Sequence, residues 1–247
     1  MLSDHVACAC GSAHGGGVAC GPNWSRRGLL RGGLAVTAAL IAGTSASFTL
    51  PRSARAQAAM TPDAALKAMM DGNKRFTQGQ MNSFNEDLKE LKEKTAESQS
   101  PFAAVLSCAD SRVPVELVFD QSIGHLFVVR VAGNIATADL IASLEYGTAV
   151  LGTKAIMVLG HASCGAVDAT IKAKAVPGQI STLYRSIRPA VDQAGSNLEA
   201  AIKANAKIQA GLLRTSSPVF ADQLKNNQLK IVAAFYDLAS GAVTLLD

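Results

Sequence analysis

Four short apolar runs constrain the fold of this chain more than any other feature of its sequence. Each run is apolar at nearly every position, whereas a half-exposed strand alternates apolar and polar residues. Continuous apolar runs of this length are typical of parallel strands that helices cover on both faces. The runs are residues 102–107, 126–131, 155–160 and 229–235.

Segments with helical spacing separate these runs, at 139–151, about 179–193 and 197–213. We expect Asp139 to cap the first of them. A further helix is predicted at 62–78, with Thr61 as its cap and Pro62 in its first turn. The polar segment 80–98 reads as a connection with a short helix.

This alternation predicts an α/β domain with an open, mostly parallel four-stranded sheet flanked by helices. The last residues, 236–246, contain the turn sequence A-S-G at 239–241. They predict a short antiparallel strand at the edge of the sheet.

Residues 1–58 differ in composition from the rest of the chain. They hold five of the 23 Lys and Arg residues but one of the 19 Asp and Glu residues, so 18 of each remain in 59–247. A balanced domain gives no support for nucleic-acid binding. The stretch S-R-R-G-L-L-R at 25–31 resembles the twin-arginine export motif, and an apolar stretch and the small-residue site A-Q-A at 56–58 follow it.

We therefore expect 1–58 to be a cleaved signal peptide and 59–247 to be a single catalytic domain in the periplasm. Contact with the membrane would then occur only through the export machinery. The alternative is an uncleaved leader that anchors the protein in the membrane.

Two of the five cysteines lie in the predicted domain, each just after a strand. Cys108 follows the first strand, and His161 and Cys164 follow the third. The carboxyl ends of parallel strands open into a common crevice, so these side chains are expected to meet. Two cysteines and one histidine form a known catalytic zinc set. A disulfide is the alternative in an oxidising compartment, but it would leave His161 without a role.

Asp110 and Arg112 follow Cys108 closely in C-A-D-S-R. The carboxylate is expected either to take the fourth zinc position or to pair with Arg112 and accept a hydrogen bond from a nucleophilic water. A purely structural ion pair is the third reading.

The motifs C-A-D-S-R at 108–112 and G-H-A-S-C-G at 160–165 closely resemble those of the β-class carbonic anhydrases. Supporting stretches lie at 124–134, 143–146 and 236–243. The resemblance implies reversible, zinc-dependent hydration of carbon dioxide to bicarbonate, with one zinc ion per chain bound by Cys108, His161 and Cys164. It also implies that Asp110 and Arg112 form a catalytic dyad, and that Asp110 is a zinc ligand only in a closed state.

Further features resemble the plant-type branch of that family, in which Gln99, Phe127 and Tyr146 would bind substrate. Core packing for the two aromatic residues and an exposed loop position for Gln99 are the alternatives. Val105 stands where bicarbonate-regulated members carry Trp, so an unregulated site is expected. Members of the family form homodimers or higher oligomers. Two other functions stay open at this point: hydrolysis of carbonyl sulfide or carbon disulfide, and non-catalytic zinc binding.

Overall fold

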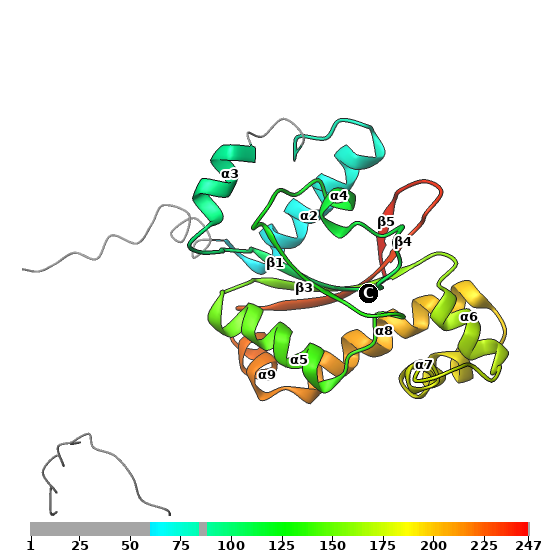
Figure 1. Cartoon of the computed structure of the whole chain (residues 1–247). Coiled ribbons are helices and arrows are strands. Elements are labelled where there is room, and N and C mark those ends of the chain that lie inside the picture. Colours follow the sequence, from blue (N-terminus) through cyan, green and yellow to red (C-terminus); the bar gives the residue numbers. More distant parts are fainter. Residues whose placement is uncertain (1–59, 84–87, 247) are drawn as a thin grey trace, which may run out of the picture. The chain divides into compact units, whose positions relative to one another are not determined.

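The computed structural model describes residues 60–83 and 88–246, which form an α/β domain around one five-stranded sheet (Figure 1). The strand order is β2-β1-β3-β4-β5. Four strands are parallel, and β5 runs antiparallel to β4 at the edge. The predicted mostly parallel sheet and its antiparallel C-terminal edge are thus confirmed. The strands are β1 (Ala103–Ser107), β2 (Leu126–Arg130), β3 (Ala155–His161), β4 (Lys230–Tyr236) and β5 (Val243–Leu245).

Helices cover both faces of the sheet, as Figure 1 shows. One face carries α2 (Pro62–Thr77), α3 (Leu88–Thr95) and α4 (Val115–Val118). The opposite face carries α5 (Ala138–Glu145), α8 (Leu198–Ser216) and α9 (Pro218–Lys225), with α6 (Gly165–Lys172) and α7 (Thr182–Ala194) beside the end of α8.

The caps of two helices test the sequence-based expectations. The Thr61 hydroxyl accepts a hydrogen bond from the Ala64 N–H at 3.2 Å, so the predicted cap of α2 is confirmed. The expectation that Asp139 caps α5 is wrong, because Thr137 is the N-cap and Asp139 lies in the first turn. A carboxylate there still stabilises the positive end of the helix dipole. Beyond α5 the predicted helix continues as one π-helical turn, Tyr146–Val150.

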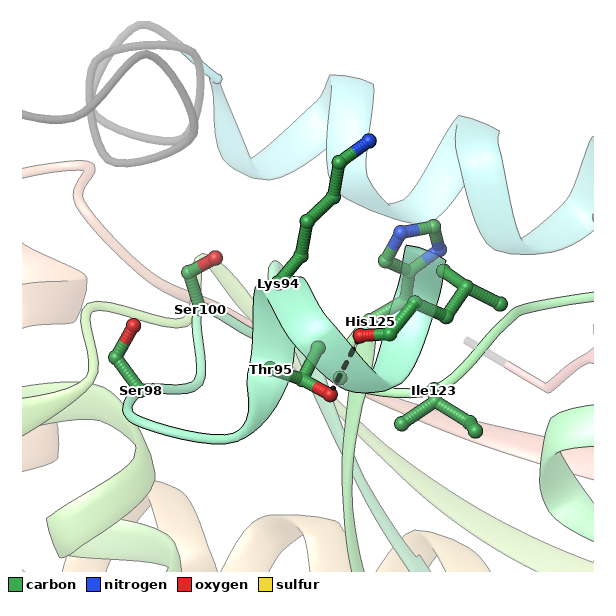
Figure 2. Close-up of a pocket in the computed structure, with 8 residues that line it drawn as sticks. Lys94, Thr95, Ser98, Ser100, Ile123 and His125 are labelled. Atoms are coloured by element: carbon green, nitrogen blue, oxygen red, sulfur yellow. Dashed lines mark hydrogen bonds between the residues drawn. The ribbon is translucent and has the colours of Figure 1, made fainter. Parts of the chain in front are cut away.

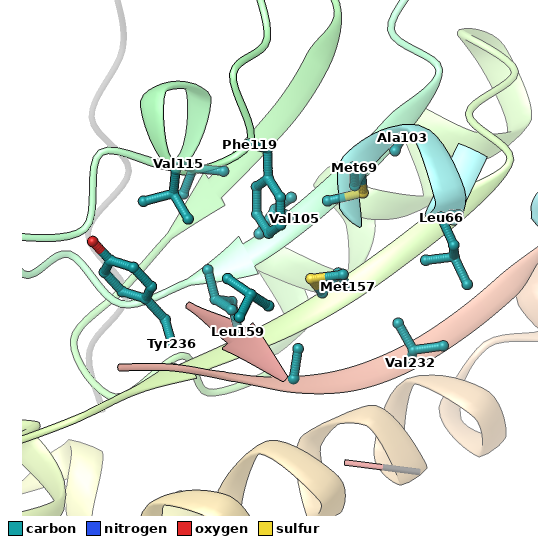
Figure 3. Close-up of a cluster of buried hydrophobic side chains, with 14 of the residues drawn as sticks. Leu66, Met69, Ala103, Val105, Val115, Phe119, Met157, Leu159, Val232 and Tyr236 are labelled. Atoms are coloured by element: carbon teal, nitrogen blue, oxygen red, sulfur yellow. The ribbon is translucent and has the colours of Figure 1, made fainter. Parts of the chain in front are cut away.

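The core has two layers, one on each face of the sheet. All five residues of β1 are buried. Val105 packs into the cluster under α2, with Met69 and Met157, whereas Ala104 and Leu106 face the opposite layer. Figure 3 shows the first layer. Two-sided burial is what the continuous apolar runs predict, and it holds the carboxyl ends of the strands in fixed positions.

The predicted signal peptide, 1–58, lies outside the described residues. Within 60–83 and 88–246, no helix combines the length and apolar character of a membrane span.

Candidate metal centre

Three side chains that the sequence singles out meet at the carboxyl end of the sheet. Ser107 of β1 pairs with Leu159 of β3. Cys108 lies one residue beyond this pair, just after β1, and His161 lies two residues beyond it on β3. Cys164 follows as the N-cap residue of α6. The Sγ atoms of the two cysteines and a ring nitrogen of His161 lie within 4.8 Å of one another, and all three residues are buried. The prediction that strand ends bring them together is confirmed.

The imidazole of His161 is oriented to offer a lone pair to this cluster. Its Nδ1 atom lies 2.9 Å from the carbonyl oxygen of Ala162, which accepts the Nδ1–H. The Nε2 atom is buried and has no hydrogen-bond partner among the described residues. A buried polar atom without a partner is costly, and histidines that bind metals typically donate their other N–H to a backbone carbonyl. The residues present therefore fit a metal ion bound at Nε2.

The two thiols are both free and share a hydrogen bond rather than a covalent bond. The Cys164 thiol donates to Cys108, and together with the Gly133 N–H it lowers the pKa of Cys108. That same bond to Cys108, together with burial, raises the pKa of Cys164. Both thiols must be deprotonated to bind zinc, so zinc binding at this pair would release protons.

Asp110 and Arg112 form a bidentate ion pair beside the cluster. Nε and Nη2 of Arg112 donate to Oδ1 and Oδ2 of Asp110 at 2.9 and 2.8 Å, and the Arg112 backbone N–H donates to Oδ1 at 2.9 Å. The guanidinium of Arg112 holds the pKa of Asp110 well below its usual range. Nη2 also donates to the Ser163 carbonyl at 3.3 Å, which ties the loop after β1 to the loop after β3.

Arg130, which the sequence analysis missed, braces the same loop from β2. Its Nε donates to the Cys108 carbonyl at 3.1 Å, and its Nη2 donates to the Asp110 carbonyl at 2.7 Å. The signal was present in the sequence as a charged residue at the end of an otherwise apolar strand, L-F-V-V-R. These two hydrogen bonds fix the backbone at Cys108, a predicted zinc ligand, and at Asp110, the carboxylate of the dyad.

The predicted substrate-binding residues lie away from the cluster of their own chain. Phe127 and Tyr146 lie near each other, with ring centroids 6.3 Å apart. Phe127 pairs with Ala104, four residues before Cys108, which at about 3.3 Å per residue places it roughly 13 Å back along the sheet. Gln99 is exposed, and Tyr146 is 48% exposed. The structure brings the two aromatic residues together but does not bring them to the metal ligands.

A separate cavity of about 550 Å³ lies beside α3 (Figure 2). Its lining includes Lys94, Ser98, Ile123 and His125 and none of the predicted ligands. His125 precedes β2 and therefore lies at the amino end of the strands, where its ring packs against Phe102 with centroids 6.3 Å apart. This position suits a structural residue and is remote from the metal cluster.

Comparison with known proteins agrees with this geometry. A model of the family described as carbonic anhydrase matches residues 103–243. Carbonic anhydrase 2 of Mycobacterium tuberculosis is 32% identical over 194 residues, which cover 75% of this chain and 93% of that protein. The carbonic anhydrase of Mycolicibacterium smegmatis is 35% identical over 192 residues, covering 74% and 93%.

Among solved structures, the Coccomyxa β-carbonic anhydrase in complex with acetazolamide superposes with a TM-score of 0.56 at 28% identity, over 64% of this chain and 78% of that one. The family match at residues 103–243 includes both strand ends that supply the cysteines and the histidine. This chain belongs to the β-class carbonic anhydrases, the zinc lyases that interconvert carbon dioxide and bicarbonate.

Proposed function

We propose that Cys108, His161 and Cys164 hold the zinc ion on three sides, and that Asp110, fixed by Arg112, orients the water that attacks carbon dioxide. Three protein ligands with one open position are the usual catalytic arrangement. When bound there, zinc lowers the pKa of water toward neutrality and so supplies a hydroxide nucleophile.

The hydrogen bonds around Asp110 carry this proposal. An ionised carboxylate offers about four acceptor positions. Arg112 fills two on Oδ1 and one on Oδ2, which leaves one lone pair on Oδ2. That oxygen lies 3.9 Å from Nε2 of His161, so the remaining acceptor is on the side of the predicted metal ligands. Asp110 is thereby positioned to accept one hydrogen bond from a reacting water and to fix its orientation.

A carbon dioxide hydration assay with zinc analysis on residues 59–247 tests these roles. Asp110→Asn is expected to keep zinc and to lose at least about 100-fold in rate, because the amide can present N–H instead of a lone pair. Cys108→Ser is expected to lose both zinc and rate. Asp168→Asn, at an exposed pair with Lys172, is the matched control. Wild-type turnover in Asp110→Asn would remove Asp110 from the mechanism.

We further propose a closed state in which Asp110 leaves Arg112 and becomes the fourth zinc ligand. Both carboxylate oxygens of Asp110 accept hydrogen bonds from Arg112, and the closed state would require these bonds to break. Zinc-edge absorption across a pH series tests this proposal. A ligand set that stays constant while activity switches off would contradict it.

The plant-type branch is proposed from Gln99, Phe127, Tyr146 and Val105. Because Phe127 lies well back from Cys108 along the sheet and Tyr146 is exposed, we propose that a second subunit brings them near the substrate. A homodimer or a higher homo-oligomer is therefore part of the proposal. Val105 is fully buried in the layer under α2, where it leaves no polar group for bicarbonate. Inhibition of the resting enzyme by bicarbonate at a second site would argue against this branch.

We also propose that 1–58 is a cleaved twin-arginine signal and that the mature domain, 59–247, works in the periplasm. The paired Arg26 and Arg27 and the A-Q-A site support it. Cell fractionation of the full chain, with N-terminal sequencing of the product, tests both points. Replacing Arg26 and Arg27 by Lys should retain the protein in the cytoplasm. A full-length chain in the membrane fraction would favour an anchor instead.

A further inference from the structure

Helix α8 carries two buried amide side chains that the reaction scheme does not use. Asn205 is 0% exposed and Gln209 is 1% exposed, one helical turn apart and so on the same face. The other buried residues of α8 are apolar: Ala201, Ile202, Ala206, Ala210 and Leu213. Burying an amide is costly unless its hydrogen bonds are made, so the partners of this pair indicate what it does.

Both amides bind the loop that follows β2. Nδ2 of Asn205 donates to the Gly133 carbonyl at 2.9 Å, and Oε1 of Gln209 accepts the Ala136 N–H at 2.9 Å. Nε2 of Gln209 donates to Oδ1 of Asn205 at 3.2 Å and to the Ser186 carbonyl at 3.0 Å. Because Gln209 occupies Oδ1, the amide of Asn205 can turn only one way, with its N–H toward Gly133.

The loop that Asn205 and Gln209 bind contacts the sulfur atom of Cys108. A turn at Val131–Asn134 is closed by the Asn134 N–H, which donates to the Val131 carbonyl at 2.9 Å. Gly133 is its third residue and has a φ of +77°, as a type II turn requires. The Gly133 N–H then donates to Sγ of Cys108 at 3.3 Å.

The peptide after Gly133 is therefore held at both ends. Its carbonyl accepts from Asn205, and its N–H, on Asn134, donates to Val131. The peptide before Gly133 supplies the N–H that reaches the sulfur. When the peptide after Gly133 is fixed, the N–H of the peptide before Gly133 is fixed as well. Gly133 has no side chain that could hold the turn, so this restraint must come from the backbone contacts.

We propose that Asn205, held in place by Gln209, is a positioning residue for the metal-binding thiolate of Cys108. The inference rests on the proposed role of Cys108 as a zinc ligand. A hydrogen bond to a ligand sulfur orients it and withdraws electron density from it, and loss of such outer contacts typically costs 10–100-fold in metal affinity. An amide that merely satisfied a buried carbonyl would affect stability and leave the metal unchanged.

The test compares Asn205→Ala with Met69→Ala in the full-length domain. Met69 is equally buried but lies in the layer under α2, on the opposite face of the sheet, so its variant matches the loss of stability without touching the loop. Two properties are measured: zinc affinity by competition with a chelator, and the thiolate-to-metal charge-transfer band of the cobalt-substituted protein.

We expect Asn205→Ala to bind zinc about 10–100-fold more weakly and to shift the cobalt band, while Met69→Ala keeps both wild-type values. Zinc affinity within twofold of wild type and an unmoved band would overturn the proposal, however far the melting temperature falls. If Asn205→Ala does not fold, Gln209→Leu, which frees Asn205 to turn, is judged by the same two measurements. Failure of the proposed function itself would be seen separately, as absence of zinc or of carbon dioxide hydration in the wild type.

Discussion

Nε2 of His161 and Oδ2 of Asp110 lie 3.9 Å apart with no hydrogen bond between them. The Nδ1–H of the imidazole is used by Ala162, so Nε2 presents a lone pair, and the nearest carboxylate oxygen presents one as well. Two electron-rich atoms thus face the same small space, next to two sulfur atoms. A cation in that space would stabilise the native state directly.

Zinc removal is therefore expected to lower the melting temperature of the domain. At a free zinc concentration of about 100 times Kd, the bound ion adds about 2.7 kcal/mol to the free energy of unfolding. Scanning calorimetry with a chelator, and after zinc is restored, measures the change. Cys108→Ser serves as the control, because its melting temperature should not respond to zinc. An equal response in that variant would mean that zinc stabilises the protein at another place.

Acid sensitivity should depend on Asp120, which is buried against α2. Burial alone would raise its pKa, but the N–H groups of Ser83 and Asn82 and the Arg75 guanidinium outweigh burial and lower the pKa to about 2. Since this folded-state pKa lies below the unfolded value, the stabilisation is complete above about pH 4 and is lost as the pH falls through 2. The shift corresponds to about 2 kcal/mol.

Asp120→Asn should therefore lower the free energy of unfolding at pH 7 by about that amount, and the difference from wild type should vanish near pH 2. Urea unfolding at several pH values measures it. Asp71→Asn, at an exposed pair with Lys67, should change the free energy of unfolding much less than Asp120→Asn does. A loss for Asp120→Asn that stays constant down to pH 2 would show that packing, not charge, is responsible.

Gly133→Ala should destabilise the domain by more than the strain of its positive φ, because the new methyl group would also overlap with neighbouring side chains. A methyl group there would come 2.7 Å from Cδ1 of Ile187 and 3.2 Å from Cβ of Ala166. Gly152 provides the matched control, with a φ of +78° and no atom within 4 Å of such a methyl group. Gly152→Ala should cost about 1 kcal/mol from strain, and Gly133→Ala about 1–3 kcal/mol more from overpacking. Equal losses in chemical denaturation would show that the loop can move away from α7.

Subunit mixing tests whether the aromatic pair acts on a partner's site. Cys108→Ser should be inactive because it loses zinc, and Tyr146→Ala should be impaired in the substrate pocket. If the pocket is shared, a mixed oligomer has sites with an intact Cys108 from one subunit and an intact Tyr146 from the other. Activity should then exceed the sum of the separate variants, measured after joint refolding. Strict additivity would place Tyr146 in its own subunit's site or outside the site altogether.

Much of the fold could be predicted because the strands are buried on both faces and so carry an unbroken apolar signal. The helices α4, α6 and α9 were missed. They have four, eight and eight residues, and too few turns to display a helical period. The π-helical turn after α5 was also missed, since its apolar residues continue the pattern of the helix before it.

The ligand cluster was predictable because its residue types are chemically specific and follow strand ends directly. The contacts that support it were not. Asn205 and Gln209 lie on a distant helix, and nothing in their local sequence points to the loop after β2. Likewise, sequence alone cannot show that Phe127 lies near Tyr146 yet far from Cys108, because that depends on strand register.

The division of the ligands between β1 and β3 also sets an order of events during maturation. In the unfolded chain only His161 and Cys164 stay close in space, because they are neighbours in the sequence. Two ligands bind zinc more weakly than three. Cys108 joins them when β1 pairs with β3, so high affinity arrives with the central sheet and not before it. Tight zinc binding would therefore indicate that β1 and β3 have paired.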